Sequence, residues 1–178
     1  QGNPVDVSRD RTDDPKTNPF LKMHLDAKAG IDLLVKRGAP ADRLAVVGAS
    51  VGCSVALHVA HVHPDAVAAA VLMTPGTAYL GVPSVEHAKS WGNRPALIIS
   101  SVQEADRGAR PLKATMTGED VKMLLIPERG IHGTRMFGRV ATIEADIIEW
   151  LQAALMTNLE LKIPVTKDLF IDGAFEAD

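Results

Sequence analysis

The sequence has little of what marks a disulfide-rich, membrane-spanning or nucleic-acid-binding protein. Its one cysteine, Cys53, excludes a disulfide within the chain. The longest apolar runs, such as residues 66–73, are far shorter than the roughly 20 residues that span a bilayer. With 19 basic and 22 acidic residues, the net charge is −3, so no excess of Lys and Arg favours nucleic acid or an anionic membrane as a partner.

The composition is that of a folded globular protein. Apolar residues make up 46% and charged residues 23% of the 178 positions, enough for one domain with a sizeable core. The first residues lack the apolar run of a signal peptide. This leaves the cellular compartment undecided, because the chain does not begin with Met.

Helical patterns alternate with short apolar runs along most of the chain. Asn18-Pro19 predicts a helix start, and Gly38 predicts its end. The apolar runs lack the alternation of half-exposed strands, so we expect strands buried on both faces of a mostly parallel sheet flanked by helices, an α/β fold. The predicted strands are residues 44–49, 66–73, 96–101 and 121–126, and the later helices are residues 51–61, 84–91 (with Ser84 as the cap), 110–116 and 140–155.

The domain organisation predicted from this rhythm has three parts. Residues 1–20 form a polar loop segment, and residues 21–156 form the α/β domain. Residues 157–178 are a tail that does not continue the alternation. Its stretch from Leu169 to Gly173 resembles the opening strand of several modules, carbohydrate-binding sandwiches among them, so the tail is a candidate start of another module.

One motif carries chemistry. Gly48, Ser50 and Gly52 form a G-x-S-x-G pattern at the end of a predicted buried strand and the start of a predicted helix. A sharp strand-to-helix turn of this kind presents the serine hydroxyl above the sheet, with glycines where chains pass closely. The N–H of Val51 then becomes a candidate donor to a developing oxyanion.

A serine needs a base and an orienting acid to act as a nucleophile. His132 follows the last predicted strand on a glycine-flanked loop, where an open α/β sheet gathers its active-site residues. Glu104 and Asp106 follow the third predicted strand. We prefer Glu104 as the acid because it is nearer the strand end, and keep Asp106 as the second choice. The chain order Ser50, acid, His132 fits a serine triad on this kind of sheet.

With these motifs the chain resembles the C-terminal half of an α/β-hydrolase domain of the compact esterase or dienelactone-hydrolase-like kind. The matching pieces are RLAVVGASVG, AAAVLMTPG, RPALIISS, IPERGIHGTRMF and IIEWLQAAL. The resemblance implies a serine esterase-type hydrolase with Ser50 as nucleophile and His132 as base, acting on a small acyl or ester substrate without cofactor or metal. Residues 74–93 leave room for a loop and a helix but no lid domain, which favours small acyl groups.

The resemblance also implies missing parts. The family sheet has eight strands, and the earlier ones carry the second oxyanion donor, for which residues 1–43 offer no candidate. The alternative function is therefore a non-catalytic fragment, or a binding or scaffold domain with an incomplete oxyanion hole. A sheet cut in this way would have an exposed edge open to self-association.

Two other functional interpretations stand beside the triad, and Cys53 needs a separate comment. The segment around Ser50 can be read as a dinucleotide-binding turn, but no acidic residue follows at the expected spacing of about 20 positions. His61 and His63 with Asp65 suggest a metal site, although polar residues also suit a helix end. Cys53 is expected to be a small buried residue rather than a reactive thiol.

Overall fold

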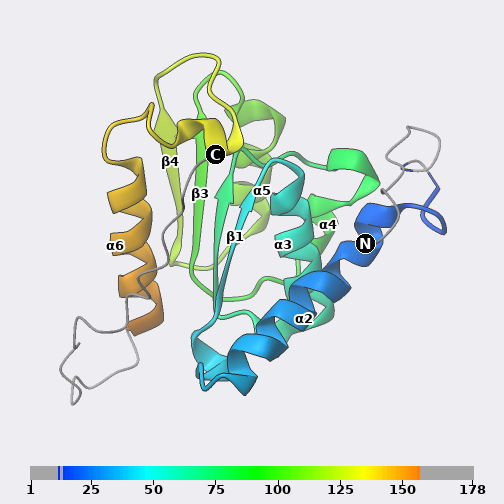
Figure 1. Ribbon diagram of the computed structural model, residues 1–178. Coiled ribbons are helices and arrows are strands. Elements are labelled where there is room, and N and C mark those ends of the chain that lie inside the picture. The colour runs from blue at the N-terminus through cyan, green and yellow to red at the C-terminus, as the bar shows by residue number, and fades with distance from the viewer. Residues whose placement is uncertain (1–11, 13, 157–178) are drawn as a thin grey trace, which may run out of the picture.

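The computed structural model describes residue 12 and residues 14–156, which form a four-stranded, all-parallel sheet with helices on both faces (Figure 1). The strands follow one another across the sheet in chain order. The predicted α/β fold with a parallel sheet is thereby confirmed. The predicted tail, residues 157–178, lies outside the described residues. The strands are β1 (Ala45–Ala49), β2 (Ala69–Met73), β3 (Ala96–Ser101) and β4 (Val121–Ile126).

The centre of the sheet is formed by β2 and β3. Every residue of both strands is buried, which explains why their sequences are apolar without alternation. Met73 at the end of β2 pairs with Ala49 of β1 and with Ile99 of β3. The carboxyl ends of the first three strands are therefore held in register, and the loops that follow them start side by side.

The strands at the two edges of the described sheet depart from the prediction. In β4 only Val121 and Ile126 are buried, and Lys122 is exposed. In β1 the departure is larger. The sequence predicted burial on both faces, but Val47 is 54% exposed, and among the described residues β1 pairs only with β2. Val46 packs into the core on the side of α3. Since the described helix on the opposite face packs chiefly on the other strands, it leaves Val47 uncovered. The prediction was wrong here because the apolar character of a run does not determine which other elements cover each face of the strand.

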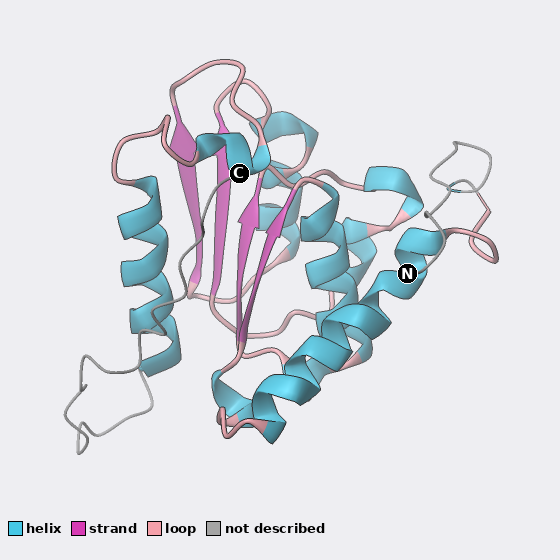
Figure 2. Cartoon of the chain, viewed as in Figure 1, coloured by secondary structure: helices cyan, strands magenta, loops and turns pink. Residues whose placement is uncertain are grey.

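The helices form two layers (Figures 1 and 2). One layer packs with the sheet around Leu57, Trp91 and Leu112, and the other packs against the opposite face through Ile143 and Ile147. Ile143 and Ile147 are four residues apart and lie on one face of the last helix, which they turn toward the sheet. The first layer contains α2 (Met23–Lys36), α3 (Val51–Val62), α4 (Ser84–Ala88) and α5 (Ala109–Thr115), and the second contains α6 (Ile143–Met156).

The start and end of the first helix follow local rules. The Asn18 side chain accepts the N–H of Phe20, capping a 3-10 turn over Pro19–Lys22 that leads into α2. Gly38, with φ of 100°, terminates the helix just after Lys36. The predicted boundaries are confirmed, with the first turn tightened to 3-10 form.

The predicted helix after β2 is shorter than expected. It ends at Ala88, and Ser84 is its first residue rather than its cap. The Ser84 hydroxyl instead bonds to the hydroxyl of Ser54 on α3 at 2.7 Å. This buried pair attaches α4 to α3. None of the described helices has the length and apolar character needed to cross a membrane.

Candidate active site

Ser50 occupies a strained turn between β1 and α3. Its φ of 54° and ψ of −121° lie outside the regions that a residue with a side chain ordinarily adopts. The Ser50 N–H donates to the carbonyl of Met73 at 2.9 Å, and the side chain makes no capping bond to α3. The hydroxyl is thus held at the carboxyl edge of the sheet and is not used to satisfy the helix end.

The two glycines of the motif differ in their surroundings. A Cβ at Gly48 would lie 2.4 Å from the carbonyl oxygen of Gly52, so only glycine fits there. A Cβ at Gly52 would meet nothing within 4 Å among the described residues. The expectation that both glycines are required by close contact is therefore correct for Gly48 and wrong for Gly52.

The loop after β4 brings His132 to the serine turn. Gly133 has φ of 55°, and a Cβ built on it would lie 3.5 Å from the Cβ of Ala49 and 3.9 Å from that of Ser50. Its N–H donates to Oγ1 of Thr74 at 2.9 Å. The histidine loop consequently packs directly against the turn that carries Ser50.

Glu104 orients the histidine. Its Oε2 lies 3.0 Å from Nδ1 of His132, and the two side chains are 25% and 34% exposed. A carboxylate on Nδ1 fixes the tautomer in which Nε2 is free to accept a proton. Asp106, the second choice, is 86% exposed and pairs with Arg110 at 2.9 Å. The structure therefore brings Glu104 to His132 and directs Asp106 elsewhere.

The described residues contain no direct hydrogen bond between Ser50 and His132. Such bonds are often long in proteins without substrate and tighten when substrate binds.

Val51 lies where the sequence predicted an oxyanion donor. It is the first residue of α3, and the first N–H groups of a helix have no partner within the helix. The same end of the helix carries the positive pole of its dipole. The backbone at Val51 can therefore stabilise negative charge on an atom next to Ser50.

Tyr79 is part of the site and was missed from the sequence. Its ring lies edge-on to the ring of His132, with 6.2 Å between centroids. Burial and the neighbouring carboxylate of Glu104 raise the pKa of Tyr79, so its phenol stays protonated near neutral pH. No motif marks this residue; its position depends on a 3-10 turn, Tyr79–Gly81, within the segment joining β2 to β3.

A small cavity adjoins the histidine. Its volume is about 160 Å³, and its lining comes from the loops after β3 and β4. The lining includes Arg107, an exposed cation near the Glu104–His132 pair. The lining residues are Gln103, Glu104, Arg107, Gly130 and His132.

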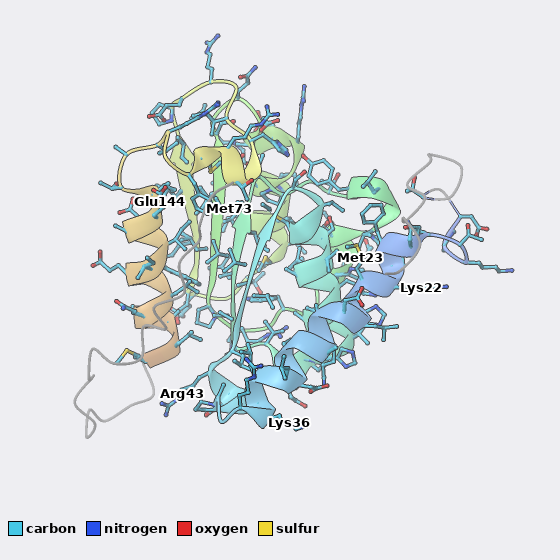
Figure 3. The ribbon with its side chains drawn as sticks, viewed as in Figure 1. Lys22, Met23, Lys36, Arg43, Met73 and Glu144 are labelled. Atoms are coloured by element: carbon cyan, nitrogen blue, oxygen red, sulfur yellow. The ribbon has the colours of Figure 1, made fainter. Side chains whose placement is uncertain are left out.

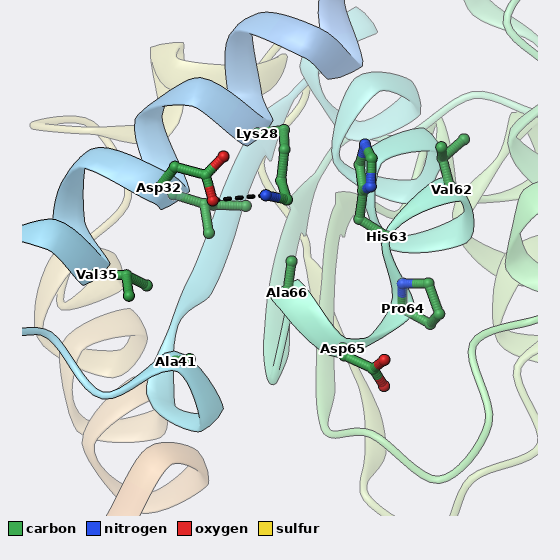
Figure 4. A pocket seen from close by; sticks show the side chains of 10 residues that line it. Lys28, Asp32, Val35, Ala41, Val62, His63, Pro64, Asp65 and Ala66 are labelled. Atoms are coloured by element: carbon green, nitrogen blue, oxygen red, sulfur yellow. Dashed lines mark hydrogen bonds and ion pairs between the residues drawn. The ribbon is translucent and has the colours of Figure 1, made fainter.

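A larger cavity, of about 430 Å³, lies between α2 and the end of α3, away from Ser50 (Figure 4). Lys28 and Asp32 form an ion pair at its rim, and His63 and Asp65 line it. His61, the other histidine of the suggested metal site, instead bonds to Ser90 at 2.7 Å. The part of the chain that the structure describes contains no cluster of three or more His, Cys, Asp or Glu residues suited to a metal ion.

Cys53 is buried behind the serine turn, as predicted. Its thiol donates to the carbonyls of Gly48 and Met73 at 3.2 and 3.3 Å. Burial raises the pKa of Cys53, so the thiol stays protonated and is not a nucleophile. The residue ties the turn to β2 instead.

Comparison with models of known protein families gives no match for this chain, and a search of curated proteins gives none either. Its function must therefore be argued from the site itself.

Proposed function

We propose that this protein is a serine hydrolase of the α/β-hydrolase type, which cleaves an ester or related acyl bond through an acyl-enzyme. One observation carries the proposal. A serine in a strained strand-to-helix turn adjoins a loop whose histidine is hydrogen-bonded to a carboxylate. Each of the three residues comes from a different loop at the carboxyl edge of one parallel sheet, where such folds place their chemistry.

The first half of the reaction forms an ester on Ser50. His132 Nε2 takes the hydroxyl proton as the serine oxygen attacks the substrate carbonyl. The Glu104 carboxylate stabilises the imidazolium that results, and the N–H of Val51 donates to the developing oxyanion. His132 then gives the proton to the leaving group as the bond to it breaks, and the acyl group remains on Ser50.

The second half releases the acyl group by hydrolysis. Water takes the place of the leaving group, and His132 removes one of its protons while the remaining hydroxide adds to the acyl carbonyl. Collapse of this intermediate returns the proton to Ser50 and frees a carboxylic acid. These steps use only side chains and backbone of the chain, so the mechanism calls for neither a metal nor an organic cofactor.

The proposed substrates carry small acyl groups. Between β2 and β3 the chain forms only the turn at Tyr79–Gly81 and the short helix α4. Neither is long enough to build an extended apolar tunnel over Ser50. Faster cleavage of long-chain than of short-chain p-nitrophenyl esters would contradict this choice.

The test of the proposed function is hydrolysis of p-nitrophenyl acetate by the purified chain and by Ser50→Ala. We expect the substitution to lower kcat by about 10³-fold or more, because removing the nucleophile abolishes the acyl-enzyme route. The Ser54→Ala variant is the matched control, since Ser54 lies on the first turn of α3 after Ser50 but bonds to Ser84. Equal rates for wild type and Ser50→Ala would refute the proposal.

The alternative is a binding or scaffold domain with the triad side chains but an incomplete oxyanion hole. The open space beside Gly52 and the exposure of Val47 favour it, because the described residues leave that side of the serine turn uncovered. Loss of one oxyanion donor typically lowers kcat by about 10²–10³-fold. Absence of any Ser50-dependent hydrolysis in the folded chain would favour this alternative.

A further inference from the structure

The carboxyl end of β2 holds both halves of the candidate site. The carbonyl of Met73, labelled in Figure 3, accepts the N–H of Ser50 at 2.9 Å and the thiol of Cys53 at 3.3 Å. The next residue, Thr74, accepts the N–H of Gly133 on its Oγ1 at 2.9 Å. Two successive residues of one strand end thus contact the serine turn and the histidine loop.

Thr74 has an unusual backbone for its type. Its φ of 54° is rare for any residue with a side chain and rarer for one branched at Cβ. The residue is only 1% exposed, and its N–H donates to the carbonyl of Ile99 on β3 at 2.6 Å. Strain of this kind persists where surrounding bonds fix it, and it concentrates at functional sites.

The bond to Gly133 decides where the histidine loop lies. The N–H of Gly133 is buried, and Thr74 Oγ1 is the partner that satisfies it. On its other side Gly133 packs beside Ala49 and Ser50, and a Cβ built on it would be in van der Waals contact with both. A shift of the Gly133 backbone would therefore change the distance between His132 and Ser50.

We propose that Thr74 is a positioning residue, which fixes His132 relative to Ser50 by accepting the Gly133 N–H. The inference rests on the proposed hydrolase function and adds a residue outside the triad to it. Thr74 acts through Gly133 and touches no reacting atom. Its effect should consequently fall on the rate of the proton transfers and not on substrate binding.

The test compares Thr74→Val with Thr74→Ser. Valine keeps the shape of threonine but removes the acceptor, whereas serine keeps the acceptor and removes only a methyl group. With p-nitrophenyl acetate we expect Thr74→Val to lower kcat by about 10–100-fold with KM within about threefold, because a small misplacement of a catalytic group has effects of this size. Thr74→Ser should restore kcat to within about threefold of wild type.

Two further measurements separate positioning from general damage. Urea unfolding reports whether each variant is folded, and hydrogen exchange of the Gly133 amide, followed by NMR, reports the bond directly. We expect that amide to exchange slowly in wild type and Thr74→Ser and faster in Thr74→Val. Thr74→Ala, which also lacks the acceptor, provides a second variant should the valine not fold.

The outcomes distinguish this inference from the proposed function. A wild-type chain without Ser50-dependent hydrolysis refutes the function, and the positioning role with it. An active wild type with equally active Thr74→Val or Thr74→Ala refutes the role of Thr74 alone. So does a rise in KM that accounts for the loss, or failure of both variants to fold while Thr74→Ser folds, since either shows a different role for the side chain.

Discussion

Nδ1 of His132 lies 3.0 Å from Oε2 of Glu104, although the two residues are 28 positions apart in the chain. The contact forms because β3 and β4 pair in parallel, with Ser101 opposite Ile126 at their carboxyl ends. The loops that leave these two ends carry the acid and the base. The pair therefore follows from sheet register rather than from any local motif.

This contact predicts that Glu104 and Asp106 are not interchangeable. Glu104→Gln leaves the imidazole without its carboxylate, and we expect kcat for p-nitrophenyl acetate to fall by about 10²–10⁴-fold. Asp106→Asn, which affects only an exposed pair with Arg110, should stay within about twofold of wild type. Steady-state kinetics of both variants checks this, and a larger loss for Asp106→Asn would reverse the assignment.

Gly133 and Gly130 offer a matched pair on the histidine loop. Both have positive φ, 55° and 69°, so alanine strains the backbone at either site. At Gly133 the strained backbone also carries the N–H bond to Thr74 and adjoins His132, whereas a Cβ at Gly130 meets nothing within 4 Å. We expect Gly133→Ala to lower kcat by about 10-fold or more beyond Gly130→Ala. Equal losses would show that backbone strain alone determines the effect.

Five of the six histidines form a stack between α2, α3 and α4. Ring centroids of His58 and His87 are 4.4 Å apart; the His61 ring stacks on His87 at 4.9 Å, and the His24 ring is tilted against His58 at 4.5 Å. Burial, and after it the charges of neighbouring histidines, lower the pKa of His58 and His87 to about 4, while Glu86 acts in the opposite direction on His87. The fifth member, His63, contacts His24 at 5.8 Å.

The stack predicts acid sensitivity. The unfolded chain takes up protons below about pH 6.5, whereas the folded rings resist protonation until about pH 4, so stability is complete above pH 6.5 and is lost as pH falls through this window. We expect the free energy of unfolding to decrease by about 5 kcal/mol more in wild type than in His58→Phe/His87→Phe between pH 7 and pH 4.5. Urea titrations at the two pH values test this.

The control for that experiment is His132→Gln, which lies outside the stack. It should lose stability on acidification as the wild type does. If the double variant is as acid-sensitive as wild type, the stacked histidines are not the cause of the sensitivity.

The exposed face of β1 predicts self-association. Val47 is 54% exposed on a strand at the edge of the described sheet, and it lines a surface pocket together with exposed Leu34 of α2. Edge strands of this kind pair with other chains, and a charged residue on them prevents it. We expect wild type to show concentration-dependent oligomers by light scattering and Val47→Lys to be largely monomeric. Identical mass distributions for the two proteins would contradict the prediction.

Local signals predicted much of the fold. Asn18, Pro19 and Gly38 marked the limits of the first helix, and the apolar runs of β3 and β4 matched the observed strands. These features depend on caps and on burial, which neighbouring residues in the chain record directly. The serine turn was likewise readable, because its glycines and its place after a strand are local properties.

Other features depend on contacts between distant segments. The exposure of Val47 depends on which elements cover β1, and no residue near it in the sequence indicates that. The edge contact of Tyr79 with His132 and the bond between Thr74 and Gly133 join the loop after β2 to the loop after β4. These loops meet only in the folded sheet, so no local signal predicts their contacts. The choice between Glu104 and Asp106 needed the direction of two side chains on one turn, which spacing does not determine.

The most direct test of the proposed hydrolase is covalent labelling of the folded chain with a fluorophosphonate. The reagent phosphonylates only a serine activated by a base, releasing fluoride as the serine oxygen bonds to phosphorus. We predict one adduct by intact mass, mapped to Ser50 by peptide sequencing, with labelling slowed strongly in His132→Gln and abolished in Ser50→Ala. An unlabelled wild-type chain, or an adduct that persists in Ser50→Ala, would contradict the account.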